Sequence, residues 1–140
     1  MRKMIIISSG VSFIGAIYSF ILFYPYFISQ SCAFGYSCPM LFTLPVCFYG
    51  FLGFLFLFSL TARLWFVSDL TMKNRLTLTF FWATLFGMLF ALYFLIQELF
   101  TEECSRGECH FSLAYPSCLY GFFLFFLLFL LARRMSKKER

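Results

Sequence analysis

Charged side chains are scarce in this chain of 140 residues, where Asp, Glu, Lys and Arg together make up only 12%. Residues 4–62 contain no charged residue and no histidine, and two further uncharged apolar stretches cover residues 76–97 and 111–132. A soluble globular domain carries about twice this share of charge, so the composition excludes that class. Hydrophobic residues make up 62% of the chain and aromatic residues 24%. The sequence therefore predicts an integral membrane protein.

Several common catalytic patterns are also missing from the sequence. There is no glycine-rich phosphate-binding loop, no arrangement of serine, histidine and aspartate, and no pair of opposite charges within an apolar stretch. No C-x-x-C motif occurs, and the only histidine is His110. The sequence thus gives no positive support for nucleotide chemistry, hydrolysis or transport, although a transporter built on two repeats stays open as an alternative.

The apolar stretches have the length of membrane-spanning helices. A helix of 22 residues, such as 76–97, rises about 33 Å, and the hydrocarbon core of a bilayer is about 30 Å thick. The first uncharged stretch is too long for one span and is interrupted by Gly, Pro, Cys and polar residues. We expect a single all-α membrane domain, 1–140, that forms a four-transmembrane-helix bundle, with helices at about 4–28, 41–67, 76–100 and 111–134.

The basic residues predict how the helices are oriented. Of the eleven Lys and Arg residues, ten lie at the two termini or near the loop at 68–75. The positive-inside rule places these parts in the cytoplasm, so the loops at 29–40 and 101–110 face outward. We expect a multi-pass protein of the cytoplasmic or ER-type membrane, surrounded by the lipid bilayer. This topology explains the net charge of +5, and nucleic acid is not expected as a partner.

The two halves of the chain, about 4–67 and 76–134, repeat one another. Cys32 matches Cys104, 72 positions later, and beyond the loop the offset becomes 71 positions. At this second offset the segment LPVCFYGF (44–51) matches YPSCLYGF (115–122), so each half has a helix, a loop with two cysteines and a second helix. Because both halves begin on the same side, we predict two parallel-repeat helical hairpins.

Small residues recur at helical spacing in the first helix of each half. They are Ser8, Ser12 and Ala16, then Val11, Gly15 and Ser19 in the first half, and Ala83, Gly87 and Ala91 in the second. Such faces let helix backbones approach closely, which matters in lipid because burial of apolar surface gives little drive between helices. We expect the helices to pack through these faces, while the phenylalanines of the second helices meet lipid or fill the core.

All six cysteines lie on the predicted outer side. They are Cys32, Cys38, Cys47, Cys104, Cys109 and Cys118. Disulfides form and persist in an oxidising compartment, so two interpretations stay open: three structural disulfides that staple loops and helix ends, or redox-active thiols. The spacing of Cys104, Cys109 and His110 matches no zinc pattern, and no metal site is expected.

Cys47 and Cys118 have a distinct position in this pattern. If Pro45 and Pro116 occupy the first helical position, where a missing N–H costs nothing, each cysteine lies in the first turn of its helix. The unpaired N–H groups and the positive end of the helix dipole there favour the thiolate, which is the nucleophile in disulfide exchange. Their equivalence under the repeat predicts that the two thiols lie at matching depth and can face each other across the bundle.

Three features follow one another in the first half: VSFIGAIYSF (11–20), the loop pair Cys32 and Cys38, and LPVCFYGFLG (44–53). In their order and at similar spacing they resemble the vitamin K epoxide reductase family, to which the DsbB-type membrane proteins are similar. The stretch GMLFALYFLIQELF (87–100) likewise resembles the family's third helix.

This resemblance implies a four-helix membrane oxidoreductase that passes electrons from a thioredoxin-like extracytoplasmic protein to a quinone. It implies that Cys32 and Cys38 exchange with that partner, and that Cys104, Cys109 and Cys118 supply the disulfide on the quinone side. Where the family has a C-x-x-C at the start of the fourth helix, this chain has YPSC with the single Cys118.

Two classes of function follow from these patterns. The first is a membrane thiol-disulfide oxidoreductase that forms disulfide bonds through mixed-disulfide exchange. The alternative is a non-catalytic, disulfide-stapled membrane scaffold or partner subunit. The symmetric repeat and the missing C-x-x-C favour the alternative, because a catalyst needs an electron entry that differs from its exit. The sequence leaves open whether the protein is an enzyme and which thiols are catalytic.

Overall fold

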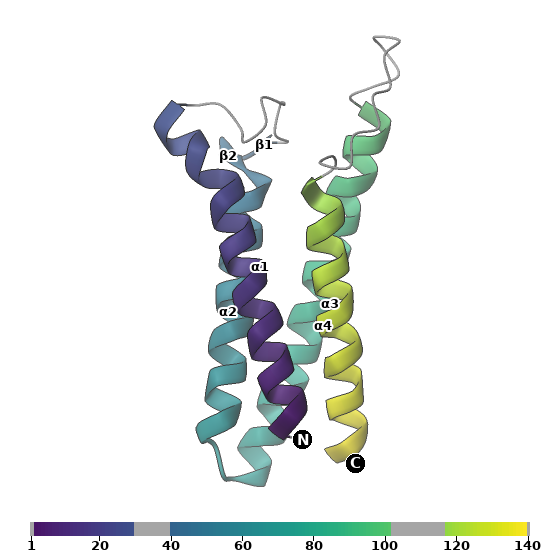
Figure 1. Cartoon of the computed structure of the whole chain (residues 1–140). Coiled ribbons are helices and arrows are strands. Elements are labelled where there is room, and N and C mark those ends of the chain that lie inside the picture. The colour runs from purple at the N-terminus through teal and green to yellow at the C-terminus, as the bar shows by residue number, and fades with distance from the viewer. Residues whose placement is uncertain (1, 30–39, 102–116, 140) are drawn as a thin grey trace.

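The computed structural model describes residues 2–29, 40–101 and 117–139. These residues form an all-α bundle of four long helices with one very short β-hairpin, which confirms the predicted fold class (Figure 1). The elements, in chain order, are α1 (Arg2–Ser29), β1 (Met40–Leu41), β2 (Leu44–Pro45), α2 (Val46–Phe66), α3 (Leu70–Thr101) and α4 (Ser117–Glu139).

The helices pack as two hairpins. α1 packs along α2 and α3 packs along α4, and less extensive contacts of α2 with α3 and of α1 with α4 join the hairpins. Both chain ends lie at the same end of the bundle as the α2–α3 connection, and we call this the terminal end (Figure 1). The opposite end, where α2 and α4 begin near Cys47 and Cys118, is the cysteine end.

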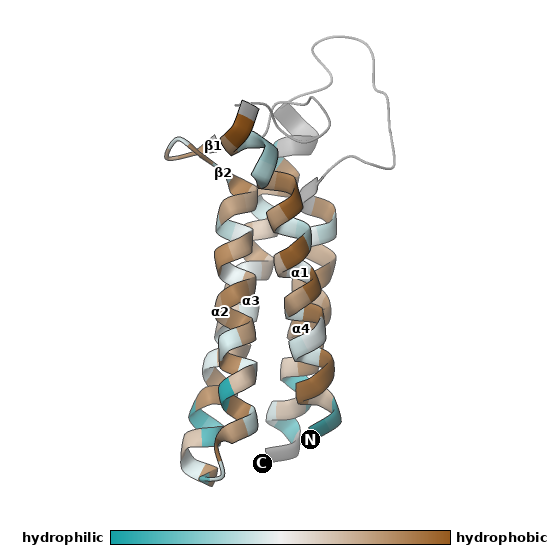
Figure 2. Cartoon of the chain, turned by 60° about the vertical axis from the view of Figure 1, so that its left-hand side comes forward, coloured by the Kyte–Doolittle hydropathy of each residue, from teal (hydrophilic) through white to brown (hydrophobic). Residues whose placement is uncertain are grey.

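Each helix is long and apolar enough to cross a membrane, as expected of a multi-pass membrane protein. The apolar segments within the described part of the chain are Arg2–Ile28, Val46–Phe66, Leu70–Gln97 and Leu119–Lys137. Large apolar side chains such as Ile14, Ile21 and Phe86 are exposed on the outside of the bundle, and Figure 2 shows hydrophilic residues gathered mainly toward the terminal end. An apolar outer surface of this extent is characteristic of a protein that lies in lipid.

α2 begins at Val46 rather than near residue 41, because a β-hairpin precedes it. β1 and β2 pair antiparallel, and the residues between them, Phe42 and Thr43, have positive φ angles of 50° and 68°. Positive φ at both central positions is typical of a type I′ hairpin turn. Pro45, with φ −66° and ψ 141°, is extended and stands just before the helix instead of in its first turn. Cys47 is therefore the second residue of α2.

The connection between the two hairpins is shorter than expected and spans only residues 67–69. Asp69 caps α3, because its carboxylate accepts a hydrogen bond from the Thr71 N–H at 3.1 Å. A side-chain acceptor at this position satisfies one of the N–H groups that the first helical turn leaves unpaired. Most of the loop expected at 68–75 is thus helical, and α3 begins before its uncharged stretch.

Two phenylalanines form the centre of the bundle. Phe54 of α2 and Phe125 of α4 stack with their ring centroids 4.4 Å apart and an interplanar angle of 19°. Their side chains are only 1% and 5% exposed. The two residues are 71 positions apart, so they occupy equivalent places in the repeat. The stack therefore joins the two hairpins across their pseudo-twofold axis.

Two glycines make room for this stack. A Cβ atom at Gly15 of α1 would lie 2.6 Å from the Phe54 ring, and one at Gly87 of α3 would lie 2.3 Å from the Phe125 ring. Carbon atoms in favourable contact are about 3.5–4 Å apart, so no side chain fits at either position without displacing a ring. Gly15 and Gly87 are 72 positions apart and are also equivalent in the repeat.

Small hydroxyl side chains occupy other parts of the interior. The buried polar residues of the described chain are Ser8, Ser12, Ser19, Thr61, Thr77 and Thr84. Thr61 and Thr84 each donate a hydrogen bond to a carbonyl of their own helix, at 2.9 Å and 2.8 Å. The predicted small-residue face of α1 is therefore inside the bundle, and the phenylalanines are divided between the core and the outer surface.

Replacing Gly15 or Gly87 by alanine is expected to lower the free energy of unfolding by about 1–3 kcal/mol, the usual cost of overpacking a core. The added methyl group would collide with a ring that is held by its stacked partner. Unfolding by sodium dodecyl sulfate in micelles measures the change. Gly10→Ala is the matched control, because a Cβ atom there meets nothing within 4 Å. Equal losses in all three variants would contradict the role given to the stack.

Candidate functional site

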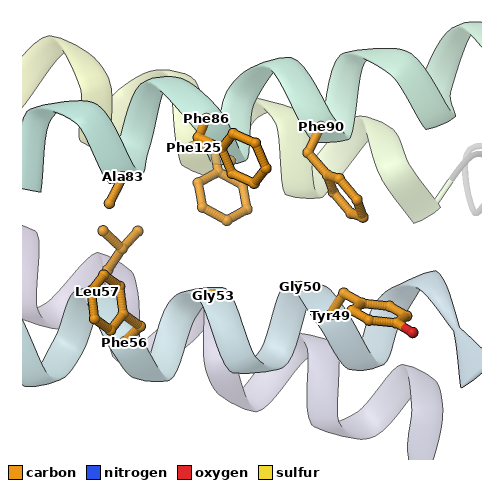
Figure 3. Close-up of a pocket in the computed structure, with 10 residues that line it drawn as sticks. Tyr49, Gly50, Gly53, Phe56, Leu57, Ala83, Phe86, Phe90 and Phe125 are labelled. Carbon is orange, nitrogen blue, oxygen red and sulfur yellow. The ribbon is translucent and has the colours of Figure 1, made fainter.

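A cavity of about 410 Å³ lies between α2 and α3 and extends from the middle of the bundle toward the cysteine end (Figure 3). Its lining residues are Tyr49, Gly50, Gly53, Phe56 and Leu57 of α2, Ala83, Phe86, Gly87 and Phe90 of α3, and Phe125 of α4. Half of these residues are aromatic, and we call this space the aromatic cavity.

Three small residues help to open the aromatic cavity. α2 contributes Gly50 and Gly53, and α3 contributes Ala83, which lies opposite Leu57 (Figure 3). These positions carry little or no side chain, so part of the space between the two helices stays unfilled. The rings of Tyr49 and Phe90 contact each other with centroids 6.4 Å apart and border the cavity at the cysteine end (Figure 3).

The walls of the aromatic cavity are apolar, and none of the lining residues is charged. The one side-chain hydroxyl is that of Tyr49, which donates a hydrogen bond to the carbonyl of Leu41 at 3.0 Å and so ties β1 to α2. Phe56 and Phe86 are 53% and 72% exposed, which means that the cavity reaches the outer surface of the bundle. Such a space suits a flat, apolar ligand that enters from the membrane.

Cys47 lines a second, narrower cavity, which we call the axial cavity. Its volume is about 50 Å³, and all four helices contribute to its lining: Tyr18, Ser19, Leu22, Val46, Cys47, Gly50, Phe54, Phe90, Gly121 and Phe125. Gly50, Phe90 and Phe125 line both cavities. The axial and aromatic cavities therefore adjoin, and the half-buried Cys47 lies beside the space between α2 and α3.

Cys118 has in α4 the backbone position that Cys47 has in α2. Each is the second residue of its helix, and each lies three residues before a glycine, Gly50 or Gly121, that lines the axial cavity. The side chain of Cys118 lies outside the described part of the structure, so the prediction that the two thiols face each other stays a prediction.

The ring contacts between the hairpins follow the same symmetry. Tyr49 contacts Phe90 on the α2–α3 side, and Tyr120 contacts Tyr18 on the α4–α1 side with centroids 5.8 Å apart. These pairs are equivalent under the two offsets of the repeat. The aromatic residues near the cysteine end thus brace both junctions between the hairpins.

The other predicted site residues, Cys32, Cys38, Cys104 and Cys109, lie outside the described residues, as does His110. Of the predicted set, Cys47 is the residue whose surroundings the structure describes. Within residues 2–29, 40–101 and 117–139, no three His, Cys, Asp or Glu residues gather as metal ligands would.

Sequence reasoning does not single out the aromatic cavity. The sequence predicts that Ala83 and Gly87 pack closely against a neighbouring helix. Gly87 does so against Phe125, and both residues also line the cavity. The signal for the cavity is the group of small residues Gly50, Gly53 and Ala83 on two neighbouring helices, but helical spacing alone does not show whether such residues touch or leave a space.

No protein-family model matches this chain, and no curated protein or solved structure matches it either. The function is therefore inferred from the side chains and cavities described above.

Proposed function

We propose that this protein is a membrane thiol-disulfide oxidoreductase that passes electrons from a thioredoxin-like partner to a quinone and so forms disulfide bonds. The observation that carries the proposal is the position of Cys47 in the axial cavity, directly beside the aromatic cavity. Exchange between a thiol and a quinone dissolved in the membrane needs a cysteine next to a ring-lined space that lipid-soluble molecules can reach.

A quinone head group fits the chemistry of the aromatic cavity. The head group is flat and largely apolar, and aromatic walls such as Phe86 and Phe90 favour offset or edge-to-face contact with a ring. The exposed rings of Phe56 and Phe86 border the cavity on the outer surface, where a hydrocarbon tail can remain in lipid. Tyr49 can accept a hydrogen bond from the quinol product while its own proton stays bonded to the Leu41 carbonyl.

The electrons and protons balance in this reaction. Two cysteine thiols lose two electrons and two protons when they form a disulfide, and a quinone that takes up both becomes a quinol. We assign Cys47 and its repeat equivalent Cys118 to the quinone side, because Cys47 lines the axial cavity. The loop cysteines relay electrons from the partner through mixed disulfides. They are Cys32, Cys38, Cys104 and Cys109, so the proposal departs from the family resemblance, which places Cys104 and Cys109 on the quinone side.

The proposed orientation follows from charge. Basic residues of several elements gather at the terminal end, among them Arg2, Lys73, Arg133 and Lys137. The positive-inside rule puts this end in the cytoplasm. The cysteine end then faces an oxidising compartment, in which disulfides persist and the thioredoxin-like partner would dock.

A non-catalytic scaffold is the competing proposal, and one observation favours it. The Phe54–Phe125 stack and its two supporting glycines, Gly15 and Gly87, have equal roles in both hairpins. This part of the core is therefore symmetric, whereas a catalyst needs an electron entry that differs from its exit. In this alternative the cysteines form structural disulfides and the aromatic cavity holds lipid chains.

A non-reducing peptide map tests the redox proposal. The purified protein is reduced, freed of reductant, and alkylated before and after addition of a short-chain ubiquinone. We expect at least one cysteine pair to become oxidised, with one quinol formed per disulfide. Cys47→Ser is expected to abolish quinol formation, because it removes the thiol beside the aromatic cavity. Ser19→Ala, in the same axial cavity, is the matched control and is expected to retain it.

The same map distinguishes the two proposals. If every cysteine of the reduced protein stays unoxidised after the quinone is added, and no quinol forms, the oxidoreductase is excluded and the scaffold remains. If Cys47→Ser instead forms quinol at the parental rate, another cysteine must be the one that reacts with the quinone.

Filling the aromatic cavity tests where the quinone binds. Ala83→Phe is expected to weaken the affinity for a short-chain ubiquinone by roughly ten- to hundredfold. The new ring would take the place of a buried part of the quinone, and burial of an apolar group as large as a Phe side chain contributes about 1.5–3 kcal/mol. Equilibrium dialysis of the detergent-solubilised protein measures the affinity. Ala62→Phe is the control, because Ala62 is also a half-buried alanine but lines neither cavity. Unchanged affinity in Ala83→Phe would exclude this cavity as the quinone site.

A further inference from the structure

Two cavities lie at the terminal end of the bundle, at the opposite end from Cys47. The first, of about 380 Å³, lies between α3 and α4 and is lined by Leu78, Phe81, Trp82, Arg133, Ser136 and Lys137. We call it the α3–α4 site. The second, of about 270 Å³, lies where α2 ends, and its lining includes Arg2, Trp65, Ser68 and Lys73. We call it the α2-end site.

The two sites share one set of side chains. Each combines an arginine, a lysine, a serine and a tryptophan, and the chain contains only two tryptophans. The repeat does not produce this likeness. At the offset of 71 Trp65 matches Ser136, and at the offset of 72 Trp82 matches Gly10, so the two tryptophans are not equivalent positions. The same chemistry is thus assembled twice from different positions, which indicates a common kind of ligand.

Side chains of these types are suited to bind a phospholipid head group at a membrane surface. A guanidinium fork and an ammonium group bind phosphate oxygens, and a serine hydroxyl can donate a further hydrogen bond. Tryptophan is enriched at the level of lipid head groups, and Trp65 and Trp82 are 57% and 59% exposed, so their rings can contact lipid. In the α3–α4 site, Leu78 and Phe81 add an apolar wall that suits an acyl chain.

We propose that both sites bind the phosphate group of an anionic phospholipid in the leaflet at the terminal end, and that the α3–α4 site binds it more tightly. Inorganic phosphate would use the two cations of a site but would leave its apolar wall and its tryptophan without a partner. A zwitterionic phospholipid carries a positively charged ammonium group that the second cation repels. Two cations per site therefore favour a head group with net negative charge.

Nearby acidic groups explain why the two sites are expected to differ in affinity for an anionic head group. Among the described residues, those that line the α3–α4 site include no carboxylate, and its charged lining residues are Arg133 and Lys137. The α2-end site includes Ser68, whose neighbour in the chain is Asp69, the carboxylate that caps α3. That negative charge offsets part of the attraction of Arg2 and Lys73 for a phosphate.

Fluorescence quenching by brominated lipids tests the proposal. Trp65→Phe leaves Trp82, in the α3–α4 site, as the only tryptophan, and this parent protein is reconstituted into phosphatidylcholine vesicles. Brominated phosphatidylglycerol is expected to quench Trp82 half-maximally at a mole fraction at least about fivefold lower than brominated phosphatidylcholine, since one basic residue near an anionic lipid contributes about that factor.

Two double variants separate a built site from general surface charge. Arg133→Gln/Lys137→Gln is expected to abolish the preference for phosphatidylglycerol. Arg63→Gln/Arg75→Gln removes the same charge from exposed positions that line neither site, and is expected to keep the preference. If Arg133→Gln/Lys137→Gln loses helical structure, the single variant Arg133→Gln replaces it, with a smaller loss of preference expected.

Three results would overturn the proposal. Equal quenching by both lipids in the parent would show that the site does not select anionic lipid. Equal loss of the preference in both double variants would assign it to charge at the membrane surface. Release of phosphatidylglycerol by inorganic phosphate, beyond the effect of chloride at the same ionic strength, would assign the site to free phosphate.

Discussion

The stack of Phe54 on Phe125 is the contact on which the rest of the bundle depends. Lipid is as apolar as the helix surfaces, so helices in a membrane gain little from burying apolar area and associate through close packing instead. Gly15 and Gly87 allow this close packing. Gly15 leaves space for the Phe54 ring, and Gly87 leaves space for the Phe125 ring. The repeat places one such ring in each hairpin, and the two rings meet at the axis.

Small residues also open the candidate site. Toward the cysteine end, Gly50 and Gly53 of α2 carry no side chain, and the aromatic cavity lies between them and the rings of Phe86, Phe90 and Phe125. The axial cavity lies beside it and is bounded by the Phe54–Phe125 stack and by Cys47. The central contact therefore holds the hairpins together, and its Phe125 ring lines both the cavity beside the thiol and the space proposed for the quinone.

The two ends of the bundle differ in chemistry. The cysteine end combines aromatic rings with Cys47, and its described cavities carry no charged side chain. The terminal end combines arginine, lysine, serine and tryptophan in two cavities. We thus propose electron exchange with a quinone at the cysteine end and binding of anionic lipid at the terminal end. Lipid bound at the terminal end then does not compete with the quinone.

The number of helices, their apolar character and their arrangement as two parallel hairpins follow from the sequence, because span length, charge distribution and the repeat are all properties of the chain itself. The sequence predicts the first residues of the helices less accurately. A type I′ turn at Phe42 and Thr43 makes α2 begin later than expected, and the cap at Asp69 makes α3 begin earlier. The cavities depend on tertiary structure alone. Whether small residues on neighbouring helices touch or leave a space depends on the tilt and separation of the helices. Contacts between the hairpins, such as the stack of Phe54 on Phe125, determine both.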